Sequence, residues 1–230
     1  MDPIQIISLT LGAAWASGIN LYAAVLVLGY LGMTGDIFLP PELQILTNPL
    51  VLGAAALMYA IEFFADKVPG VDSGWDLVHT FIRIPAGAVL AAGMAQGLEI
   101  SQGAQLAALL VGGSVAAASH TAKTGTRLLI NTSPEPVSNW SASIAEDIAV
   151  VGGLWASLQY PWVFVIGLVL FLLLVAWLLP RIWGVLKRTF RSLSKLFKGK
   201  DSVDPAAPAA DVKKVDILRS LYQESSENKK

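Results

Sequence analysis

The chain has 230 residues, of which 54% are hydrophobic and only 14% are charged, with a formal net charge of −1. Soluble domains keep about a quarter of their residues charged, so this composition excludes an ordinary soluble domain and predicts an integral membrane protein. The chain has no cysteine and only two histidines, His79 and His120. Disulfides and thiolate chemistry are therefore excluded, and we expect neither a metal site nor a cofactor.

Taken in chain order, the apolar segments predict an all-α polytopic fold with about six transmembrane helices, each needing roughly 20 mostly apolar residues. The first segment, Ile4–Met33, contains no charged residue but is too long for one untilted helix. Because Ala16–Asn20 (ASGIN) lies near its middle, we expect a broken first element whose first half is a half-helix or a re-entrant segment. The other expected spans are Asn48–Phe64, Leu77–Gln96, Gln102–Ser119, Ser141–Leu158 and Pro161–Leu179.

Lysine and arginine fall on alternate loops. Three connections contain neither residue: Thr34–Thr47, Gly97–Ser101 and Gln159–Tyr160. Lys67, Lys123 and Arg127 flank the other connections, and a basic run, Arg181–Lys200, follows the last span. Since loops rich in lysine and arginine stay in the cytoplasm, this pattern predicts a cytoplasmic C-terminus.

An offset of 65 residues aligns two parts of the chain and predicts a weak internal repeat. The offset matches Pro69, Ser73, Trp75 and Gly87 with Pro134, Ser138, Trp140 and Gly152, and it places Glu62 on Arg127. A third fragment, SGINL at Ser17–Leu21, is similar to both turns. Each copy turns at a serine (Ser17, Ser73 or Ser138) and offers an N-cap to the next helix (Asn20, Asp76 or Ser141). Chance recurrence of small residues in membrane helices is the alternative explanation.

Polar side chains inside or beside the expected spans form the candidate site for substrate binding or gating. An ionisable group within a span costs about 2.5–3.5 kcal/mol and usually faces a protein interior or a water-filled cavity. His79 and Arg83 are four residues apart, and His120, Lys123 and Arg127 follow at spacings of three and four, so each set shares one helix face. The candidate residues are Glu62, Asp66, His79, Arg83, His120, Lys123, Arg127, Asn139, Glu146 and Asp147.

Three functions remain open for these residues. The first is a transporter or channel for a small polar or anionic solute, with a charged cavity at the repeat interface that opens to the cytoplasm and is lined by helix N-termini. The second is a lipid-handling protein that resembles a flippase or scramblase. The third is a scaffold or assembly factor in which the charges form a structural ion-pair network. The sequence has no Walker loop, metal motif or nucleophile triad, so we do not expect an enzyme.

Composition divides the chain into a transmembrane domain (residues 1–180), a basic amphipathic helix (181–200) and a flexible cytoplasmic tail (201–230). Apolar residues at helical spacing alternate with basic ones in Arg181–Lys200. We expect this helix to lie on anionic lipid headgroups, and we expect no nucleic-acid partner. Two stretches of small residues, Ala86–Gly97 and Gly103–Ser119, favour close helix packing within the chain or a homo-oligomer contact.

Three motifs also resemble a known family. These are GINLY (Gly18–Tyr22), DKVPGVDSGWD (Asp66–Asp76) and KTGTR…NTSPEPVSNW (Lys123–Trp140). They are similar to a bacterial membrane-protein family catalogued as domain of unknown function family 4126, over roughly Ile4–Leu179. The resemblance implies a location in the bacterial inner, or cytoplasmic, membrane. The family supplies neither a substrate nor a reaction, so the function has to be inferred from the site.

Overall fold

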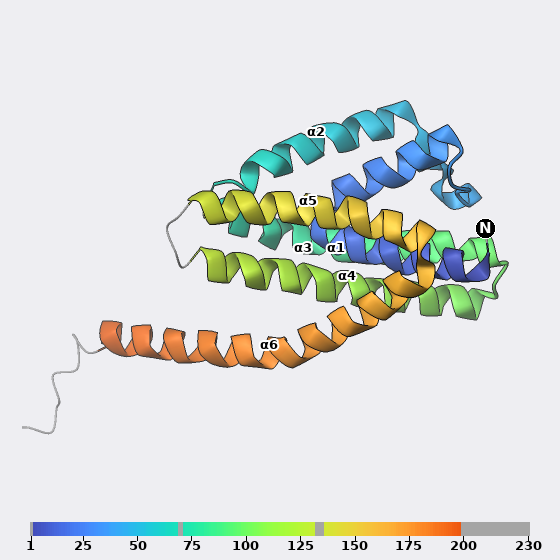
Figure 1. Cartoon of the computed structure of the whole chain (residues 1–230). Coiled ribbons are helices and arrows are strands. Elements are labelled where there is room, and N and C mark those ends of the chain that lie inside the picture. The colour runs from blue at the N-terminus through green and yellow to red at the C-terminus, as the bar shows by residue number, and fades with distance from the viewer. Residues whose placement is uncertain (1, 69–70, 132–135, 199–230) are drawn as a thin grey trace, which may run out of the picture. The chain divides into compact units, whose positions relative to one another are not determined.

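The computed structural model describes residues 2–68, 71–131 and 136–198, with the side chains of residues 73, 136 and 182–198 left out of the description. Every regular element in these ranges is a helix, as the all-α prediction requires. The elements are α1 (Pro3–Thr34), η1 (Pro41–Thr47), α2 (Pro49–Ala65), α3 (Val71–Ala95), η2 (Gln96–Leu98), α4 (Gln102–Ile130), α5 (Pro136–Gln159) and α6 (Pro161–Lys198) (Figure 1). The chain divides into two compact units, Met1–Pro180 and Arg181–Lys230.

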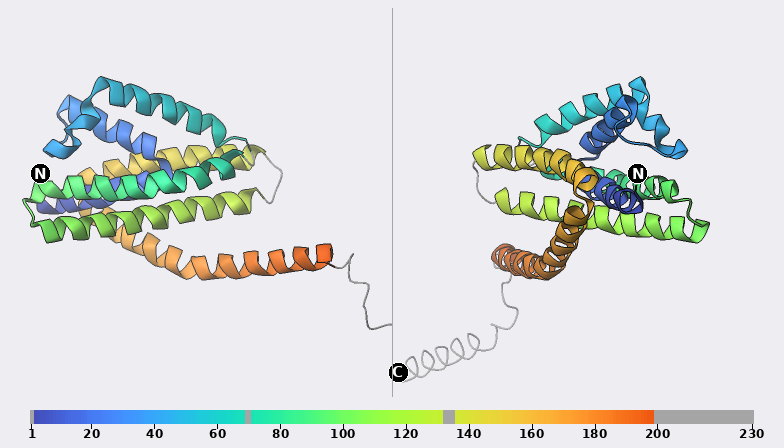
Figure 2. Two further views of the ribbon diagram at one scale, coloured as in Figure 1. Left: turned by 180° about the vertical axis from the view of Figure 1, so that it is seen from behind. Right: turned by 45° about the vertical axis from the view of Figure 1, so that its right-hand side comes forward.

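The first element, α1, is broken at the place where the sequence predicts a break. Asn20 has φ −145° and ψ 98°, which is outside the helical region, and its Oδ1 accepts a hydrogen bond from the backbone N–H of Ala23 at 3.0 Å. Asn20 therefore ends one half-helix and caps the next. Gln5 and Leu31, near opposite ends of α1, line one common cavity. Both ends of α1 thus lie at the same end of the bundle, and α1 is a helical hairpin (Figures 1 and 2).

The helices α2 to α5 form two hairpins that turn at the opposite end of the bundle (Figures 1 and 2). Their helix ends match the 65-residue offset: α2 ends at Ala65 and α4 at Ile130, whereas α3 begins at Val71 and α5 at Pro136. The internal repeat itself remains a prediction, although the helix boundaries agree with it.

Two of the expected helix caps are wrong. Asp76 and Ser141 lie inside α3 and α5, because both helices begin upstream of the Ser-Gly and Ser-Asn turns that the sequence suggested. Asp72 occupies the first turn of α3, where a carboxylate stabilises the helix start. Proline at position 136 begins α5, a position at which its fixed φ suits a helix.

The helix α6 continues through Pro180 to Lys198, whereas its apolar segment that is long enough to cross a membrane is Pro161–Arg181, close to the expected span Pro161–Leu179. Proline removes one backbone hydrogen bond from a helix without always ending it. The run Arg181–Lys200 is therefore helical up to Lys198. Its amphipathic pattern and the tail 201–230 lie outside the described side chains and residues, so both remain predictions.

Unit Met1–Pro180 has an inside-out distribution of polarity. Large apolar side chains are exposed along the helices, for example Leu50 in α2, Phe81 in α3 and Trp162 in α6, whereas Glu62 and Arg83 are fully buried. The opposite arrangement is normal in soluble proteins, where unpaired charges are almost never buried. An apolar exterior around a polar interior is typical of a protein whose surroundings are lipid.

Small residues bring the helices close together in the middle of the bundle. A Cβ atom at Gly18 would overlap Ser119 Oγ and the backbone oxygen of Ala116, so the tip of α1 packs directly on α4. A Cβ at Gly112 of α4 would overlap Ala91 of α3. The stretches of small residues therefore serve contacts within the chain, as membrane helix interfaces do.

Within the part of the chain that the structure describes, three helical segments are long and apolar enough to cross a membrane: Pro3–Thr34, Gly74–Leu98 and Pro161–Arg181. A fourth is added if η1 and α2, bent by 65° at Asn48, form one span. Helices α4 and α5 have the length of a span but contain the charged residues described below. These apolar helices indicate an integral membrane protein, whereas the count of six spans remains a prediction.

Candidate functional site

Seven charged side chains from four helices meet inside the bundle, and we call this group the charge cluster. Its members are the bases Arg83, Lys123 and Arg127 and the acids Glu62, Asp66, Asp76 and Glu146. Six of the seven side chains are at most 4% exposed, and Glu146 is 15% exposed. Burial of charges in this way is tolerated only when they are paired, because the desolvation cost per ion is several kcal/mol.

Arg83 and Lys123 hold the α2–α3 side of the cluster. Arg83 Nη2 lies 2.7 Å from Glu62 Oε1, and Nη1 lies 2.7 Å from Asp76 Oδ1. Lys123 Nζ lies 3.3 Å from Glu62 Oε1 and 3.1 Å from Asp66 Oδ2. Lys123 is thus the central cation, because it is also within 3.7 Å of Asp76 and 3.3 Å of Glu146.

Arg127 ties α4 to the end of α2 and to α5. Its Nε and Nη2 donate to the two oxygens of Glu146 at 3.0 and 2.8 Å. Its Nη1 donates to the backbone oxygens of Asp66 and Asn139, and Nη2 also donates to Asp66 Oδ2 at 3.2 Å. A guanidinium has five N–H donors, so these five bonds use them all. Arg127 therefore has no donor left for a bound anion.

The cluster has a surplus of acceptors. With every member ionised, three positive charges face four negative ones, which leaves a net charge of −1. Three buried acceptor atoms of the cluster have no hydrogen-bond partner among the described residues: Glu62 Oε2, Asp66 Oδ1 and Asp76 Oδ2. The cluster's unpartnered donor is Arg83 Nε. Buried polar groups usually find partners, so this surplus favours a bound species that brings donors or positive charge.

Two neighbouring carboxylates of α5 have different roles. Glu146 joins the cluster, whereas Asp147 accepts hydrogen bonds from Asn20 Nδ2 at 3.1 Å and from the hydroxyl of Tyr59 at 2.9 Å. Asp147 forms no ion pair with an arginine or lysine among the described residues, because residues next to each other on a helix point about 100° apart. Asp147 instead fastens the tip of α1 at Asn20 to α2 and α5.

A cavity of about 360 Å³ adjoins the cluster between α3 and α4. Its lining residues are Asp76, Leu77, Thr80, His120, Thr121, Thr124, Arg127 and Leu128. Asp76 and Arg127 are cluster members, so the cavity reaches the cluster directly. Leu77 is 68% exposed and Leu128 is 45% exposed, which places the mouth of the cavity on the apolar surface. Ligand sites typically have volumes of this size and combine apolar walls with a few polar groups.

Asp66 lies where α2 ends, beyond the apolar segment of that helix. Burial raises the pKa of its carboxyl to about 6, an effect that Lys123 opposes and Glu62 reinforces. Its Oδ2 contacts both Lys123 and Arg127, whereas Oδ1 is unpartnered. Asp66 can therefore take up a proton on Oδ1 while Oδ2 keeps its two cationic partners.

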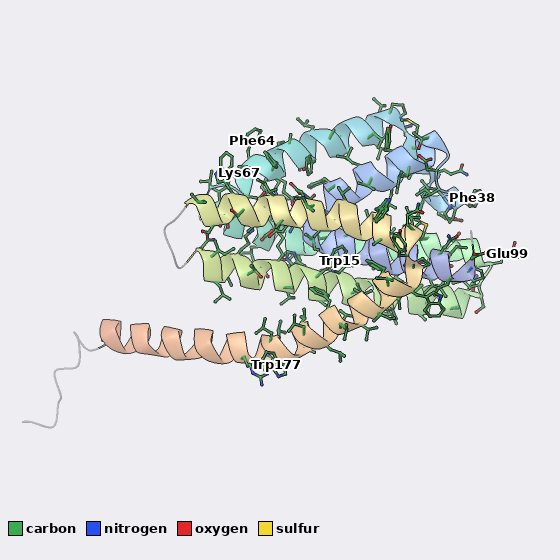
Figure 3. The ribbon with its side chains drawn as sticks, in the orientation of Figure 1. Trp15, Phe38, Phe64, Lys67, Glu99 and Trp177 are labelled. Carbon is green, nitrogen blue, oxygen red and sulfur yellow. The ribbon has the colours of Figure 1, made fainter. Side chains whose placement is uncertain are left out.

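The ends of the bundle differ in chemistry. Lys67 lies at the end of the bundle where α2 ends, near the charge cluster. It donates to the Phe63 carbonyl oxygen at 2.8 Å and lies over the Phe63 ring. Glu99 lies at the other end, close to the start of α1, as Figure 3 shows. The cluster is therefore close to the end that carries the basic loop residues.

The remaining sequence-predicted residues surround the cluster. His79 accepts or donates a hydrogen bond with the Tyr22 hydroxyl at 3.0 Å and stacks on Trp75, with ring centroids 4.3 Å apart. His120 Nε2 lies 2.7 Å from Thr80 Oγ1, and Nδ1 lies 3.4 Å from Arg83. Both histidines therefore position their neighbours, and neither forms an ion pair with a carboxylate among the described residues.

The predicted turn residues have local roles. Ser17 donates to the Arg83 backbone oxygen at 2.9 Å, which holds α1 against α3. Asn139 donates through its side chain to Asn131 at 3.0 Å. Ser141 donates to the Val137 carbonyl at the exposed face of α5, Ser138 is half-buried in the first turn, and the side chain of Ser73 lies outside the described set.

Sequence reasoning missed three contributors. Asp76, expected to be a helix cap, is a cluster acid, and its spacing of seven from Arg83 is two helical turns on one face. Tyr59, which holds Asp147, lies one turn before Glu62, and Thr80, which holds His120, lies one turn after Asp76. A search for polar residues at spacings of three, four and seven from Glu62 and Arg83 finds all three.

The comparison with protein families assigns the chain to a family. A family model described as a domain of unknown function, DUF4126, matches residues 7–181. The chain therefore belongs to this family, as the resemblance of its motifs predicts. No curated protein and no solved structure matches the chain.

Proposed function

We propose that this DUF4126 protein is a membrane transport protein that passes a small polar solute through the cavity beside the charge cluster. The observation that supports it most is the position of seven charges inside a helical unit with an apolar exterior, next to a cavity of about 360 Å³. Intramembrane ionisable groups are expensive and usually mark solute or ion pathways. The broken α1, whose tip at Asn20 meets α5, matches the discontinuous helices with which many transporters build their sites.

The proposed topology has five membrane-crossing helices, α2 to α6, and a re-entrant α1. Helices α4 and α5 run between the same two ends of the bundle as α3 (Figures 1 and 2). The connections at the Lys67 end carry the basic residues, so we place that end and the C-terminus in the cytoplasm of a bacterial cell. The cavity lies towards this end.

The hydrogen bonds of the cluster favour a neutral or cationic solute over an anionic one. All five donors of Arg127 are occupied within the protein. Lys123 is within 3.3 Å of three carboxylates. An anion would have to break these bonds and would also meet a net negative cluster.

A swelling assay tests the transport function. Proteoliposomes would be exposed to iso-osmotic glycerol, acetate or methylammonium chloride, and solute entry would be followed by light scattering. We expect faster swelling than in empty liposomes for at least one solute, and Glu99→Gln, at the far end, should leave the rate unchanged. Swelling that equals that of empty liposomes for all the solutes would rule the transport function out and favour the scaffold.

A lipid-handling function is the second candidate, because the mouth of the cavity lies on the apolar surface at Leu77 and Leu128. A lipid headgroup could reach the cluster from the bilayer through this mouth. Transfer of fluorescent phospholipid between the leaflets of proteoliposomes separates this function from solute transport.

The helix Arg181–Lys200 is proposed to bind anionic lipid. A peptide of this stretch should gain helicity on vesicles with acidic lipid and lose binding in high salt, since salt screens surface charge within roughly 10 Å at 0.1 M. Equal binding to neutral vesicles would assign the interaction to apolar burial alone.

A further inference from the structure

The polar wall of the cavity between α3 and α4 is the starting point for a substrate class. Three threonines line it, and each hydroxyl hydrogen has a partner within the protein. Thr121 donates to the Ala117 carbonyl at 2.6 Å, and Thr124 donates to the His120 carbonyl at 3.1 Å. The hydrogen of Thr80 goes either to the Asp76 carbonyl at 2.9 Å or to His120 Nε2 at 2.7 Å.

The other polar lining residues are also without free donors. Both ring nitrogens of His120 face a partner, Thr80 on one side and Arg83 on the other. Arg127 uses its five N–H groups within the cluster. The wall therefore has no N–H or O–H group left to offer to a ligand that only accepts hydrogen bonds.

One strong acceptor remains in this wall. Asp76 is 1% exposed, its Oδ1 is held by Arg83 at 2.7 Å, and its Oδ2 has no partner. Lone pairs of the three threonine oxygens add weaker acceptors beside it. The cluster behind this wall has one more acid than base, so the local charge also favours a positive ligand.

We propose that the cavity between α3 and α4 binds an ammonium group that carries N–H donors, with Asp76 Oδ2 as its main acceptor and the threonine oxygens as further acceptors. Only the transport of the bound ammonium group rests on the proposed transport function, because ammonium binding can be measured without measuring flux. The volume of about 360 Å³ suits a small ligand. A metal ion fits less well, because no group of three or more histidine or acidic side chains among the described residues is placed to hold one.

Two sources can supply such a group. One is a soluble amine, and the other is the headgroup of an ethanolamine phospholipid that enters between Leu77 and Leu128. Both present an ammonium with N–H donors, whereas the quaternary ammonium of a choline headgroup presents none.

The test uses the full chain in detergent, with thermal unfolding followed by tryptophan fluorescence. Methylammonium, ethylammonium and ethanolammonium chlorides would be titrated against sodium, potassium and tetramethylammonium chlorides and sodium acetate at equal ionic strength. We expect a saturable rise of the midpoint only with the cations that have N–H donors. Equal shifts with sodium, tetramethylammonium or acetate would overturn the proposal.

Three variants assign the effect to the cavity. Asp76→Asn should weaken ammonium binding by about tenfold or more, because a charged hydrogen bond becomes a neutral one. Leu77→Trp fills the mouth without changing any charge, so it should abolish binding even if Asp76→Asn fails to fold. Glu99→Gln should bind like the parent protein. Unchanged ammonium affinity in Leu77→Trp would overturn the proposal.

Nanodiscs separate the two sources. If phosphatidylethanolamine stabilises the protein but phosphatidylcholine and soluble amines do not, the ligand is the lipid headgroup. If soluble amines stabilise the protein, the ligand is a solute. No response to either overturns the proposal. Ammonium binding without swelling rejects transport alone, whereas swelling by glycerol without ammonium binding rejects the ammonium site alone.

Discussion

Replacement of Arg127 by methionine tests whether the charge cluster holds the helices together. The change removes five hydrogen bonds and leaves Asp66 and Glu146 without their guanidinium partner. Breaking a buried ion pair from one side typically costs about 3–5 kcal/mol. Lys123 stays within 3.1 Å of Asp66 and 3.3 Å of Glu146, so both acids keep one cation and we expect the lower end, about 3 kcal/mol.

The assay is thermal unfolding of the purified protein, in which a loss of that size lowers the midpoint by about 6–12 °C. The double variant Arg127→Met, Glu146→Gln restores the net charge of −1 and should recover part of the loss. Regained stability without regained swelling would assign the charges to the solute path, whereas recovery of both would assign them to structure. If the midpoint of Arg127→Met stayed within 1 °C of that of the parent protein, as expected for the control Glu99→Gln, Arg127 would face water. The assignment of Arg127 to a buried charge cluster would then be wrong.

Three further changes test other parts of the structure. Asn20→Ala removes the cap of the second half of α1 and one donor to Asp147, so it should cost about 2 kcal/mol in unfolding experiments, and no loss would contradict a capped break. Because the folded pKa of Asp66 is about 6 and its ordinary value is 3.8, the folded state binds more protons between these values. Stability should therefore fall as the pH rises from about 4 to 6, and Asp66→Asn should flatten this slope. An unchanged slope would show that Asp66 is not the group that takes up the proton. The chain has no cysteine, so Asp2→Cys and Asp36→Cys can be labelled without background. Both should react from one face and Lys67→Cys from the other, and labelling of positions 2 and 36 from opposite faces would refute the re-entrant α1.

The sequence predicted the elements of this fold where single residues have a strong local effect. Asn20 in a charge-free segment predicted the break, because a capping side chain in the middle of a long apolar run has few other roles. The helix starts were predicted less well. Asp76 and Ser141 are good capping residues, but the chain had already entered α3 and α5 before it reached them. Capping preference is a local quantity, and the upstream turns determine where each helix begins.

The members of the site were predicted better than their partners. Charged residues within apolar helices have to face inward, so Arg83, Lys123 and Arg127 could be assigned to one interior from composition alone. Which of Glu146 and Asp147 joins them depends on the rotation of α5 about its axis, and that rotation is set by packing across the whole bundle. The use of all five Arg127 donors likewise depends on three elements at once, α4, α5 and the end of α2. Sequence alone therefore left a small polar or anionic solute open, whereas the completed hydrogen bonds favour a neutral or cationic solute over an anionic one.

The 65-residue offset gives a reason for the negative surplus. At this offset, three acids of the first hairpin, Glu62, Asp66 and Asp76, correspond to Arg127, Asn131 and Ser141 in the second hairpin. Only the first pair exchanges an acid for a base, whereas the other two replace a carboxylate by a neutral side chain. The two hairpins are therefore complementary at Glu62 and Arg127 but leave Asp66 and Asp76 without matching bases, and Lys123 and Arg83 compensate them from α4 and α3. Glu146, which has Phe81 as its counterpart, then adds the fourth carboxylate. A network built only for stability has no need of this fourth acid, since burying an extra charge is costly, so its presence is most economically explained by a positively charged species that the cluster binds.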